Sequence, residues 1–354
     1  MSKRSLSLAS RPVIEVENEE RQELAAQLIS LEIIEDIEGM RRTELRFGAW
    51  GMTEAGSLGL LNLDRRVLEF GKSIKIRLGD EILFDGLIGA IEAEFAEAAP
   101  PVAMVLAEDR LQALRMTRRT RVFEQSSDAD IASRIAAEHG LTPDIDWPGP
   151  THGVLAQLNR SDLAFLRDRA RASGAELSVE GNKLQARLRR AGSVLELIQG
   201  ARLRQCSVSA DLAGQRSAVV ATGWDVAAKQ GISVEANPAA LGAELGSLEG
   251  GSAILDRAFG RRRETLAHSQ PSTTEEARAM SEAAYRRIAR RFVIARGEAD
   301  RDAAIMPGAT LALRGLGPLF EGDYHCTEVT HRFDQTRGFR TSFVAERPGI
   351  GRRA

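Results

Sequence analysis

The sequence predicts a mainly β fold with α+β insertions, containing two duplicated antiparallel β-barrels plus smaller peripheral domains. One motif with strand-like alternation is present twice, at positions 71–86 and 308–322. Helical spacing is confined to the region between the two copies, whereas the period of a β-strand dominates the first hundred residues. Apolar residues make up 43% of the 354 positions and charged residues 28%, which is typical of a folded chain with several domains.

The two copies of the motif share glycines, an arginine and a Phe–acid–Gly triplet in the same order. In the first copy, Ile74 and Ile76 alternate with polar residues, which is the period of a strand buried on one face. The links at 79–81 and 315–318 carry residues typical of turns. Two antiparallel hairpins can resemble each other by chance, but the shared order favours an internal duplication. The shared residues are Gly71, Arg77, Phe84 and Gly86 in the first copy, and Gly308, Arg314, Phe320 and Gly322 in the second.

Each copy is predicted to belong to a larger antiparallel sheet. Gly86 and Gly322 each follow an acidic residue, and we expect them at a turn or bulge that needs a positive φ or a close backbone approach. The first sheet of six or seven strands can curl into a barrel. The predicted strands are 14–16, 29–37 and 44–50, followed by the hairpins 87–108 and 324–346, whose tips lie at 96–101 and 334–338.

The segment after the first sheet predicts a small α+β domain. A helix begins at a capping box of Ser127 and Asp130 and ends at Gly140. A second helix begins at Ser161 and ends at Gly174, and a tight hairpin follows around 181–182.

Strand character returns from about residue 201, notably at 218–225. The stretch 238–251 is rich in Gly, Ala and Leu without periodicity and is predicted to be irregular. Ser272 and Thr273 then cap a third helix that carries one apolar stripe, and the second copy of the motif closes the fold.

Several residue pairs and one short segment suggest catalysis or ligand binding, but each also has a structural explanation. His325 and His331 are six residues apart on one predicted strand and would share a face, but no third metal ligand is placed. Asp128 and Asp130 are the acid pair that a glycosidase needs, yet their position at a helix start favours capping. Segment 71–73 resembles the end of a phosphate loop but leads into a strand. We therefore expect no catalytic residue, metal or cofactor.

Charge and hydropathy argue against several partners. The net charge is −2, and the basic clusters at 118–121, 261–263 and 286–291 lack interleaved aromatic residues, so we expect no specific nucleic-acid binding. No apolar run is long enough to span a membrane, and 1–5 does not lead into a signal peptide, so we expect synthesis in the cytoplasm. Cys206 and Cys326 have no metal-type spacing and are predicted to be ordinary buried thiols.

Several short motifs follow one another along nearly the whole chain. They are 163–167 with Gly174, a strand ending in Gly223, Trp224 and Asp225, the helix after Ser272, and Gly308, Gly317, 320–324 and His331. Each motif alone is weak, and their order is the specific feature. This order resembles the late-control-D or VgrG-type family, which comprises baseplate hubs of contractile phage tails and the hub portion of type VI secretion spike proteins.

The resemblance implies a structural hub that trimerises and adapts a six-fold tail tube to a three-fold spike. It implies a first tube barrel at 1–112, a peripheral α+β domain at 113–200 and a second tube barrel at 201–354, with an irregular insertion around 226–271. The implied partners are two further copies, the tail tube protein, neighbouring baseplate proteins and a spike, expected to be a separate chain because this one stops at Ala354. The implied location is the baseplate of a phage virion or injection particle.

Two functional alternatives remain from the sequence. The first is a hub without catalysis; the second is a hub that also binds or hydrolyses peptidoglycan through 113–200. The hairpin tips occupy matching places in the two barrels and are the candidate interface loops. Their distinguishing residues are Glu97 and Pro100 in the first tip and Asp334 and Arg337 in the second.

Overall fold

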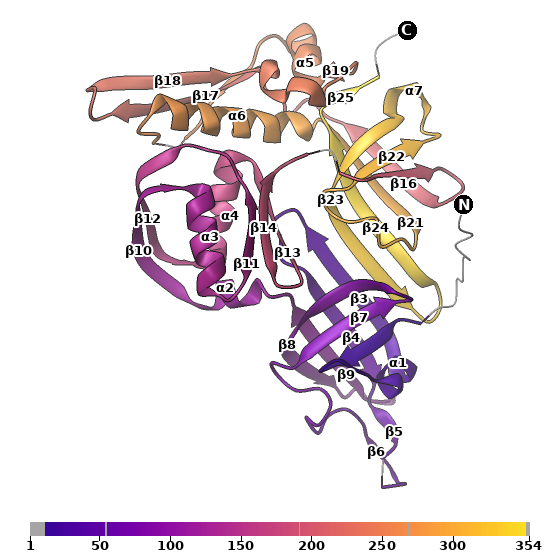
Figure 1. Ribbon diagram of the computed structural model, residues 1–354. Helices are drawn as coiled ribbons and strands as arrows, with labels where there is room; N and C mark the ends of the chain where they lie inside the picture. Colours follow the sequence, from indigo (N-terminus) through magenta and orange to yellow (C-terminus); the bar gives the residue numbers. More distant parts are fainter. Residues whose placement is uncertain (1–10, 54, 191, 268–269, 352–354) are drawn as a thin grey trace.

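One large sheet of 13 strands runs through the computed structural model, which describes residues 11–53, 55–190, 192–267 and 270–351 (Figure 1). The start of the chain at 1–5, on which the prediction of no signal peptide rests, lies outside the described residues. The strands of this sheet are β1 (Val13–Val16), β2 (Glu19–Glu20), β3 (Leu28–Asp36), β4 (Arg42–Gly48), β7 (Ser73–Leu78), β8 (Glu81–Glu94), β9 (Val102–Glu108), β15 (Val194–Ile198), β16 (Leu203–Ala210), β21 (Val293–Asp300), β22 (Thr310–Arg314), β23 (Gly322–Asp334) and β24 (Gly338–Arg347).

The sheet consists of two halves with the same pairing order. We call β3-β4-β9-β8-β7-β1 the first half-sheet and β16-β21-β24-β23-β22-β15 the second half-sheet. Corresponding strands also follow one another in the same order along the chain. The halves differ at one end, because β1 pairs antiparallel with β7 whereas β15 pairs parallel with β22. The mainly β fold class is thus confirmed, while descent by duplication stays a prediction.

Each half-sheet curls around its own apolar core. Phe47 and Phe84 are fully buried in the first core, which the short helix α1 (Gln22–Gln27) covers through Leu24. Tyr324 and Phe343 are buried in the second. Both cores form because apolar residues alternate along the strands and one face of each strand points inward. In the described residues the halves are curled sheets and not closed barrels, since β1 does not pair with β3, and β15 is joined to β16 only by an isolated bridge between Gln199 and Leu203.

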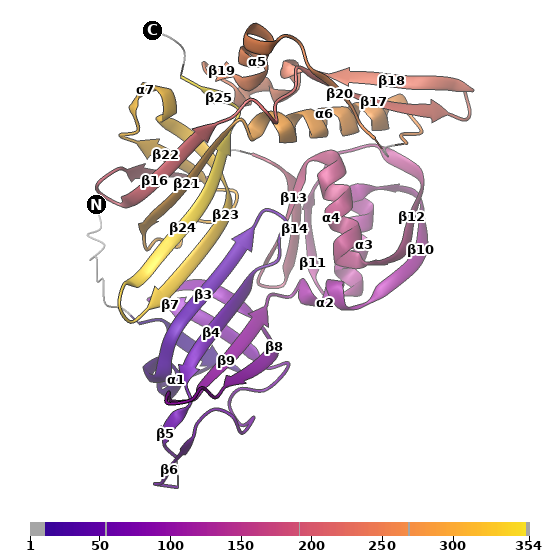
Figure 2. The same ribbon diagram turned by 180° about the vertical axis from the view of Figure 1, so that it is seen from behind.

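Strand β23 joins the two halves by changing its partner along its length. Residues 322–325 pair with β22, and residues 328–334 pair antiparallel with residues 30–36 of β3. A bulge at Thr327 separates the two segments, and the Thr327 carbonyl accepts a hydrogen bond from the Ile37 amide (3.0 Å). We call the pairing of β3 with β23 the internal junction. It makes one continuous band, β16-β21-β24-β23-β3-β4-β9-β8, seen from upper left to lower right in Figure 2.

A separate α+β unit lies beside the band and has its own core. The predicted capping box of Ser127 and Asp130 is present, Ser161 caps the second helix, and Gly174 ends it in a left-handed conformation with φ 81°. The elements of this unit are α2 (Gln112–Met116), β10 (Arg118–Ser127), α3 (Asp128–Glu138), β11 (Thr142–Asp146), β12 (Thr151–Ser161), α4 (Asp162–Ser173), β13 (Ala175–Glu180) and β14 (Lys183–Leu188). Strand β15, which the predicted boundary at residue 200 assigned to this unit, belongs instead to the second half-sheet.

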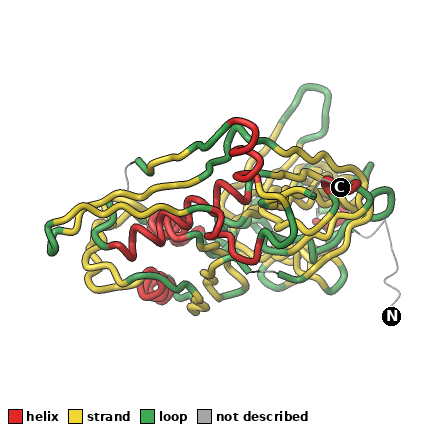
Figure 3. The backbone as a smooth tube through the Cα atoms, turned by 90° about the horizontal axis from the view of Figure 1, so that it is seen from above, coloured by secondary structure: helices red, strands yellow, loops and turns green. Residues whose placement is uncertain are grey.

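The segment between β16 and β21 is more regular than its composition suggested. Strands β17, β18 and β20 form a sheet, and the long helix α6 packs along β17 and β18, as Figure 3 shows from above. The stretch predicted as irregular, 226–271, therefore holds defined strands and two helical segments. The elements are β17 (Ala218–Asp225), β18 (Gln230–Ala236), η1 (Pro238–Glu244), β19 (Glu249–Gly250), α5 (Gly251–Phe259), β20 (Arg263–Thr265) and α6 (Thr274–Arg290).

Three small elements complete the fold. The hairpin β5 (Trp50–Met52) and β6 (Leu58–Leu60) projects from the first half-sheet, and α7 (Gly317–Phe320) fills the link between β22 and β23. Strand β25 (Gly349–Ile350) pairs with β19. Among the described residues, none of the helices combines the length and apolar character that crossing a membrane requires.

Candidate assembly surface

The two half-sheets match in register, down to the positions of their bulges. The first half has bulges at Ile29 in β3 and Gly89 in β8. The second half has bulges at Arg204 in β16 and Thr327 in β23, between the corresponding strand pairs. A bulge displaces one residue from the ladder, so these shared irregularities fix which residues correspond.

The predicted glycine pair at the start of the motif is structurally equivalent. The Gly71 amide donates to the Ile88 carbonyl (2.8 Å), and the Gly308 amide donates to the Cys326 carbonyl (2.9 Å). Both glycines have positive φ, 79° and 86°, which disfavours any residue with a Cβ atom.

The Phe–acid–Gly triplets, in contrast, are not equivalent. Gly86 lies opposite Ile74, whereas Tyr324 lies opposite Leu311, the counterpart of Ile74. Gly86 therefore corresponds to Tyr324, and the predicted match of Gly86 with Gly322 is wrong by two residues. The extra residues of the second link, which form α7, account for this difference.

The two glycines were expected to allow either a close backbone approach or a positive φ. Gly86 meets the first requirement and Gly322 the second. A Cβ atom on Gly86 would collide with the backbone of Glu108 in β9, so this glycine allows a close approach of strands. Gly322 has φ 144° and faces the guanidinium of Arg347.

The other motif residues have local structural roles. Arg77 Nε donates to Glu15 Oε1 at 2.6 Å, and Arg314 lies 3.5 Å from Asp323. Phe84 is fully buried, and Phe320 packs against the second core. Two further motif residues lie in β17: Gly223 allows the Pro271 carbonyl to approach, and Trp224 is exposed.

Both ends of the band are open strand edges in the described part of the chain. From residue 89 onward, β8 pairs with β9 on one side and has no strand on the other. At the opposite end, β16 pairs with β21 on one side, and its other side has only an isolated bridge from Leu203 to Gln199. An open edge exposes backbone donors and acceptors that another strand can satisfy.

The predicted interface tips differ in their surroundings. The first tip, with Glu97 and Pro100, is exposed from residue 96 to residue 100. In the second tip, Asp334 Oδ1 accepts hydrogen bonds from the amides of Thr336 (2.8 Å) and Arg337 (2.7 Å). Gln335 Nε2 also donates to the Leu28 carbonyl of β3 (2.9 Å), so the second tip rests on the first half-sheet.

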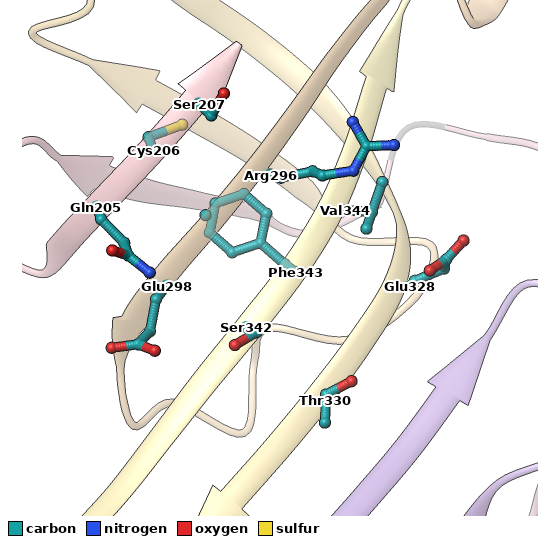
Figure 4. Close-up of a pocket in the computed structure, with 11 residues that line it drawn as sticks. Gln205, Cys206, Ser207, Arg296, Glu298, Glu328, Thr330, Ser342, Phe343 and Val344 are labelled. Atoms are coloured by element: carbon teal, nitrogen blue, oxygen red, sulfur yellow. The ribbon is translucent and has the colours of Figure 1, made fainter. Parts of the chain in front are cut away.

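Two hollows lie at corresponding places on the face of the band that points away from both cores. One, of about 510 Å³, spans β16, β21, β24 and β23 (Figure 4). Its counterpart, of about 490 Å³, spans β3, β4, β9 and β8. The residues labelled in Figure 4 are Gln205, Cys206, Ser207, Arg296, Glu298, Glu328, Thr330, Ser342, Phe343 and Val344.

The hollow in Figure 4 lacks an activated nucleophile. Burial raises the pKa of the Cys206 thiol, so the reactive thiolate is disfavoured near neutral pH. The other free cysteine, Cys326, is fully buried, and burial raises the pKa of its thiol as well. Cys326 is thus buried as predicted, whereas Cys206 is only half-buried.

The two strand histidines do not form a shared site. The bulge at Thr327 changes the alternation of β23, so His325 and His331 lie on opposite faces, contrary to the prediction. His325 Nε2 lies 3.1 Å from Glu176 of the α+β unit, and His331 is buried beside Thr341. Across the residues that the structure describes, no cluster of three His, Cys, Asp or Glu side chains is arranged to hold a metal ion.

The acid pair at the start of α3 holds the α+β unit together. Asp130 completes the capping box, while Asp128 is buried and accepts from Arg169 Nε at 2.6 Å. His152 lies beside this pair, and its Nδ1 lies 2.6 Å from Glu276 Oε1 at the start of α6. Asp128 is committed to these contacts and is unsuited to act as a glycosidase acid.

The electrostatics of this group favour an ion pair between the α+β unit and α6. Burial alone would lower the pKa of His152, but its hydrogen bonds to Asp128 and Glu276 outweigh burial and raise it. The same hydrogen bond from His152 lowers the pKa of Glu276 to about 2.

The arginines of the three basic clusters are largely paired within the chain. Such pairing leaves little excess positive charge for a nucleic-acid backbone. The pairs are Arg119 with Asp162 (3.2 Å), Arg121 with Glu138 (2.6 Å), Arg261 with Glu235 (2.8 Å), Arg263 with Glu235 (2.5 Å), Arg286 with Glu282 (3.4 Å) and Arg290 with Glu244 (2.6 Å).

Comparison with solved structures places this fold among tail proteins. The 43 kDa tail protein of prophage MuSo2 from Shewanella oneidensis has a TM-score of 0.72 at 12% identity, covering 96% of this chain and 99% of that one. The tail protein from Neisseria meningitidis MC58 gives 0.65 at 12% identity, covering 96% and 97%. An Escherichia coli component of the type VI secretion system, described as structurally similar to T4 bacteriophage tail proteins gp27 and gp5, gives 0.56 at 14% identity, covering 93% and 76%.

Sequence comparison gives a family of a different description from the one that the motifs resemble. No curated protein matches this chain. The family described as the Alg8 N-terminal domain matches residues 23–335, which include the α+β unit, α6 and most strands of both half-sheets, but neither β1 nor β24. The resemblance to the late-control-D family stays a prediction. Because the match extends over most of its length, this chain belongs to the Alg8 N-terminal domain family.

Proposed function

We propose that this protein is a structural subunit of a tail or baseplate assembly, and specifically its hub. In this proposal three chains form a ring that joins a six-fold tail tube to a three-fold spike, within a phage virion or an injection particle. The repeated strand-pairing order is the observation that supports the proposal most directly. Three chains that each carry two similar half-sheets present six similar units around one axis.

The differences between the halves supply what a three-fold partner needs. The first tip carries Glu97 and Pro100, and the second carries Asp334 and Arg337. The segment holding α6 is inserted in the second half-sheet alone. A tube protein would contact features common to both halves, while a spike and neighbouring baseplate proteins would contact features present once per chain.

The function is carried by interfaces in this proposal, not by catalysis. The titratable groups that the sequence offered as catalytic candidates are engaged in caps and ion pairs. The fold shared with prophage tail proteins and with a type VI secretion component supports the same role.

The symmetry of the assembled protein tests the proposal. Electron micrographs of the purified protein, alone and with its spike, are expected to show a ring of three chains with six similar units on one face. A stable monomer or dimer under both conditions would contradict the hub proposal and remove the reason for the repeated half-sheet.

The two tips offer a second test that separates the partners. We expect that deleting 97–99 or deleting 335–337 slows tube polymerisation in each case, while spike binding responds to one deletion only. If neither deletion alters either partner, the tips are not interface loops. Pelleting of the wild-type protein with purified cell walls, or their lysis, would favour instead the alternative that 113–200 binds or hydrolyses peptidoglycan.

A further inference from the structure

We propose that a third hollow, between the α+β unit and α6, binds a small oxyanion of the phosphate class. This hollow, of about 170 Å³, lies where the α+β unit and α6 meet the turn after β3 and the end of β24. Figure 1 shows α6 lying across the top of the α+β unit. The inference goes beyond the hub proposal and does not rest on it.

Positive charge dominates the lining of this hollow. Six arginines and three glutamates line it, which leaves an excess of three positive charges. Like charges gathered in one place repel one another, so an anion bound among them is stabilised. The arginines are Arg167 and Arg171 of α4, Arg189 just after β14, Arg287 and Arg290 of α6, and Arg291 at the end of α6.

Three of these arginines are already paired with carboxylates. Their partners include all three glutamates of the lining, so the hollow has no further carboxylate to offer the remaining arginines. The pairs are Arg171 with Glu38 (2.6 Å), Arg189 with Glu176 (3.1 Å) and with Glu346 (2.7 Å), and Arg290 with Glu244 (2.6 Å).

The other three arginines, Arg167, Arg287 and Arg291, carry the excess charge. Within the part of the chain that the structure describes, none of them forms an ion pair with a carboxylate. Arg167 Nε donates to the Glu38 carbonyl (2.9 Å), and Arg287 Nη1 lies 3.5 Å from the Arg171 carbonyl. Most of their guanidinium N–H groups are thus available to a ligand. Arg287 and Arg291 belong to the basic cluster at 286–291, for which the assembly surface provides no role.

The charge and the size of the hollow favour a phosphate-type ligand. Guanidinium groups bind phosphate and carboxylate oxygens through paired, charge-assisted hydrogen bonds. A phosphate group carries about 1.5 to 2 negative charges at pH 7, so it matches three unpaired arginines better than a single carboxylate does. The hollow is also well below the roughly 300–1,000 Å³ of sites for larger organic ligands, which favours a small anion.

A bound anion would strengthen the contact between two parts of the fold. Arg167 belongs to α4 of the α+β unit, whereas Arg287 belongs to α6. The two parts pack closely here, because a Cβ atom on Gly174 would lie 3.5 Å from the Cβ atom of Ala283. An anion held by both helices stabilises the docked state as its site fills. We therefore expect phosphate to slow hydrogen exchange in α4 and α6.

Calorimetric titration of the full chain with inorganic phosphate tests the site. Sodium chloride is used to keep the ionic strength constant, because screening alone changes interactions between charges. We expect one phosphate per chain, and a higher melting temperature in phosphate than in chloride. Arg287→Gln and Arg291→Gln are each expected to weaken binding by about ten-fold or more, because each removes charge-assisted hydrogen bonds.

Arg278→Gln is the matched control. Arg278 is exposed on the same helix and does not line the hollow, so its replacement removes the same charge and is expected to leave phosphate binding unchanged. Arg287 and Arg291 are exposed as well, so all three variants are expected to fold.

The outcomes are distinct. Absence of saturable phosphate binding by the wild-type protein, or binding by both hollow variants that equals wild type, overturns the inference. Equal weakening in Arg278→Gln and the hollow variants shows general attraction to positive charge and overturns it too. If an oligoglutamate peptide binds more tightly than phosphate and depends on the same arginines, the ligand is an acidic protein segment and the phosphate assignment is wrong. None of these results changes the symmetry seen in micrographs, so failure of the anion site and failure of the hub proposal are distinguishable.

Discussion

His331 makes the internal junction sensitive to acid. It lies in β23 opposite Ile33 of β3, is 6% exposed, and its Nδ1 is 2.9 Å from Thr341 Oγ1. Burial, assisted by the charge of Arg41, lowers the pKa of His331 from 6.5 to about 4. The side chain is therefore neutral in the folded protein at pH 7.

The sign and size of the effect follow from proton linkage. Between pH 6.5 and 4 the unfolded chain binds a proton at His331 more readily than the folded chain, so stability falls as the pH falls. At about 1.4 kcal/mol for each pH unit, the free energy of unfolding loses about 3 kcal/mol by pH 4. The protonated imidazole would then lack a second partner in an apolar junction.

A variant at position 331 separates the contribution of His331 to the pH dependence of stability from that of other titrating groups. His331→Asn keeps a hydrogen-bonding group near Thr341 but cannot titrate, although its smaller side chain lowers stability at every pH. Urea unfolding at pH 7 and pH 4 is expected to show wild type losing about 3 kcal/mol more than His331→Asn. Equal losses for the two proteins would refute the buried neutral histidine, and hydrogen exchange of β3 and β23 locates the opening.

Two further perturbations address backbone crowding and the contact between the α+β unit and α6. We expect Gly86→Val and Gly322→Val each to lower the free energy of unfolding by about 1–3 kcal/mol, because a side chain at Gly86 collides with β9 and Gly322 has a positive φ. Gly231 lies in open space, so Gly231→Val serves as a near-neutral control in the same thermal melts. If both variants melt like the control, the crowding argument is wrong. His152→Ala should raise hydrogen exchange in α6, because Glu276 loses its partner. Because the pKa of His152 is raised, this contact weakens as the pH rises above 6.5, and because the pKa of Glu276 is lowered, it weakens as the pH falls below 4.5. The amides of α6 should therefore be best protected from hydrogen exchange between these two pH values. Uniform protection from pH 3 to 9 would contradict the ion pair.

Features that depend on neighbouring residues were predictable from the sequence. The caps at Ser127 and Ser161 and the turn at Gly174 were confirmed because a helix end is decided within a few residues. The strands of both hairpins were also confirmed, since alternation records which face is buried.

Features that depend on distant residues were not predictable in this way. The bulge at Thr327 arises where β23 exchanges β22 for β3, and it reverses the face of His331 relative to His325. No local signal marks that exchange. Likewise, the extra residues of α7 place the second Phe–acid–Gly triplet two residues earlier relative to its strand. Gly86 and Gly322 therefore have the same residue type and the same order in the motif but different positions in the sheet.

The candidate assembly surface was likewise predictable only in part. The matching of the tips at Glu97 and Asp334 could be expected from the repeat alone. The open edges of β8 and β16 could not, because an edge is defined by the absence of a neighbour in the folded sheet. Phe95 would have given a hint, as an apolar residue next to a predicted tip.

The internal junction also sets the timing of folding during synthesis. Glu32 and Arg332, which form its ion pair, are 300 residues apart in the chain. At about 5–20 residues per second, a ribosome needs roughly 15–60 seconds to make the strand that covers β3. Throughout that interval the nascent chain carries an uncovered edge that fits a β23 segment from any finished copy. Neighbouring ribosomes on one messenger RNA bring together strands that can exchange. We therefore expect domain-swapped dimers among the misfolded products of this chain.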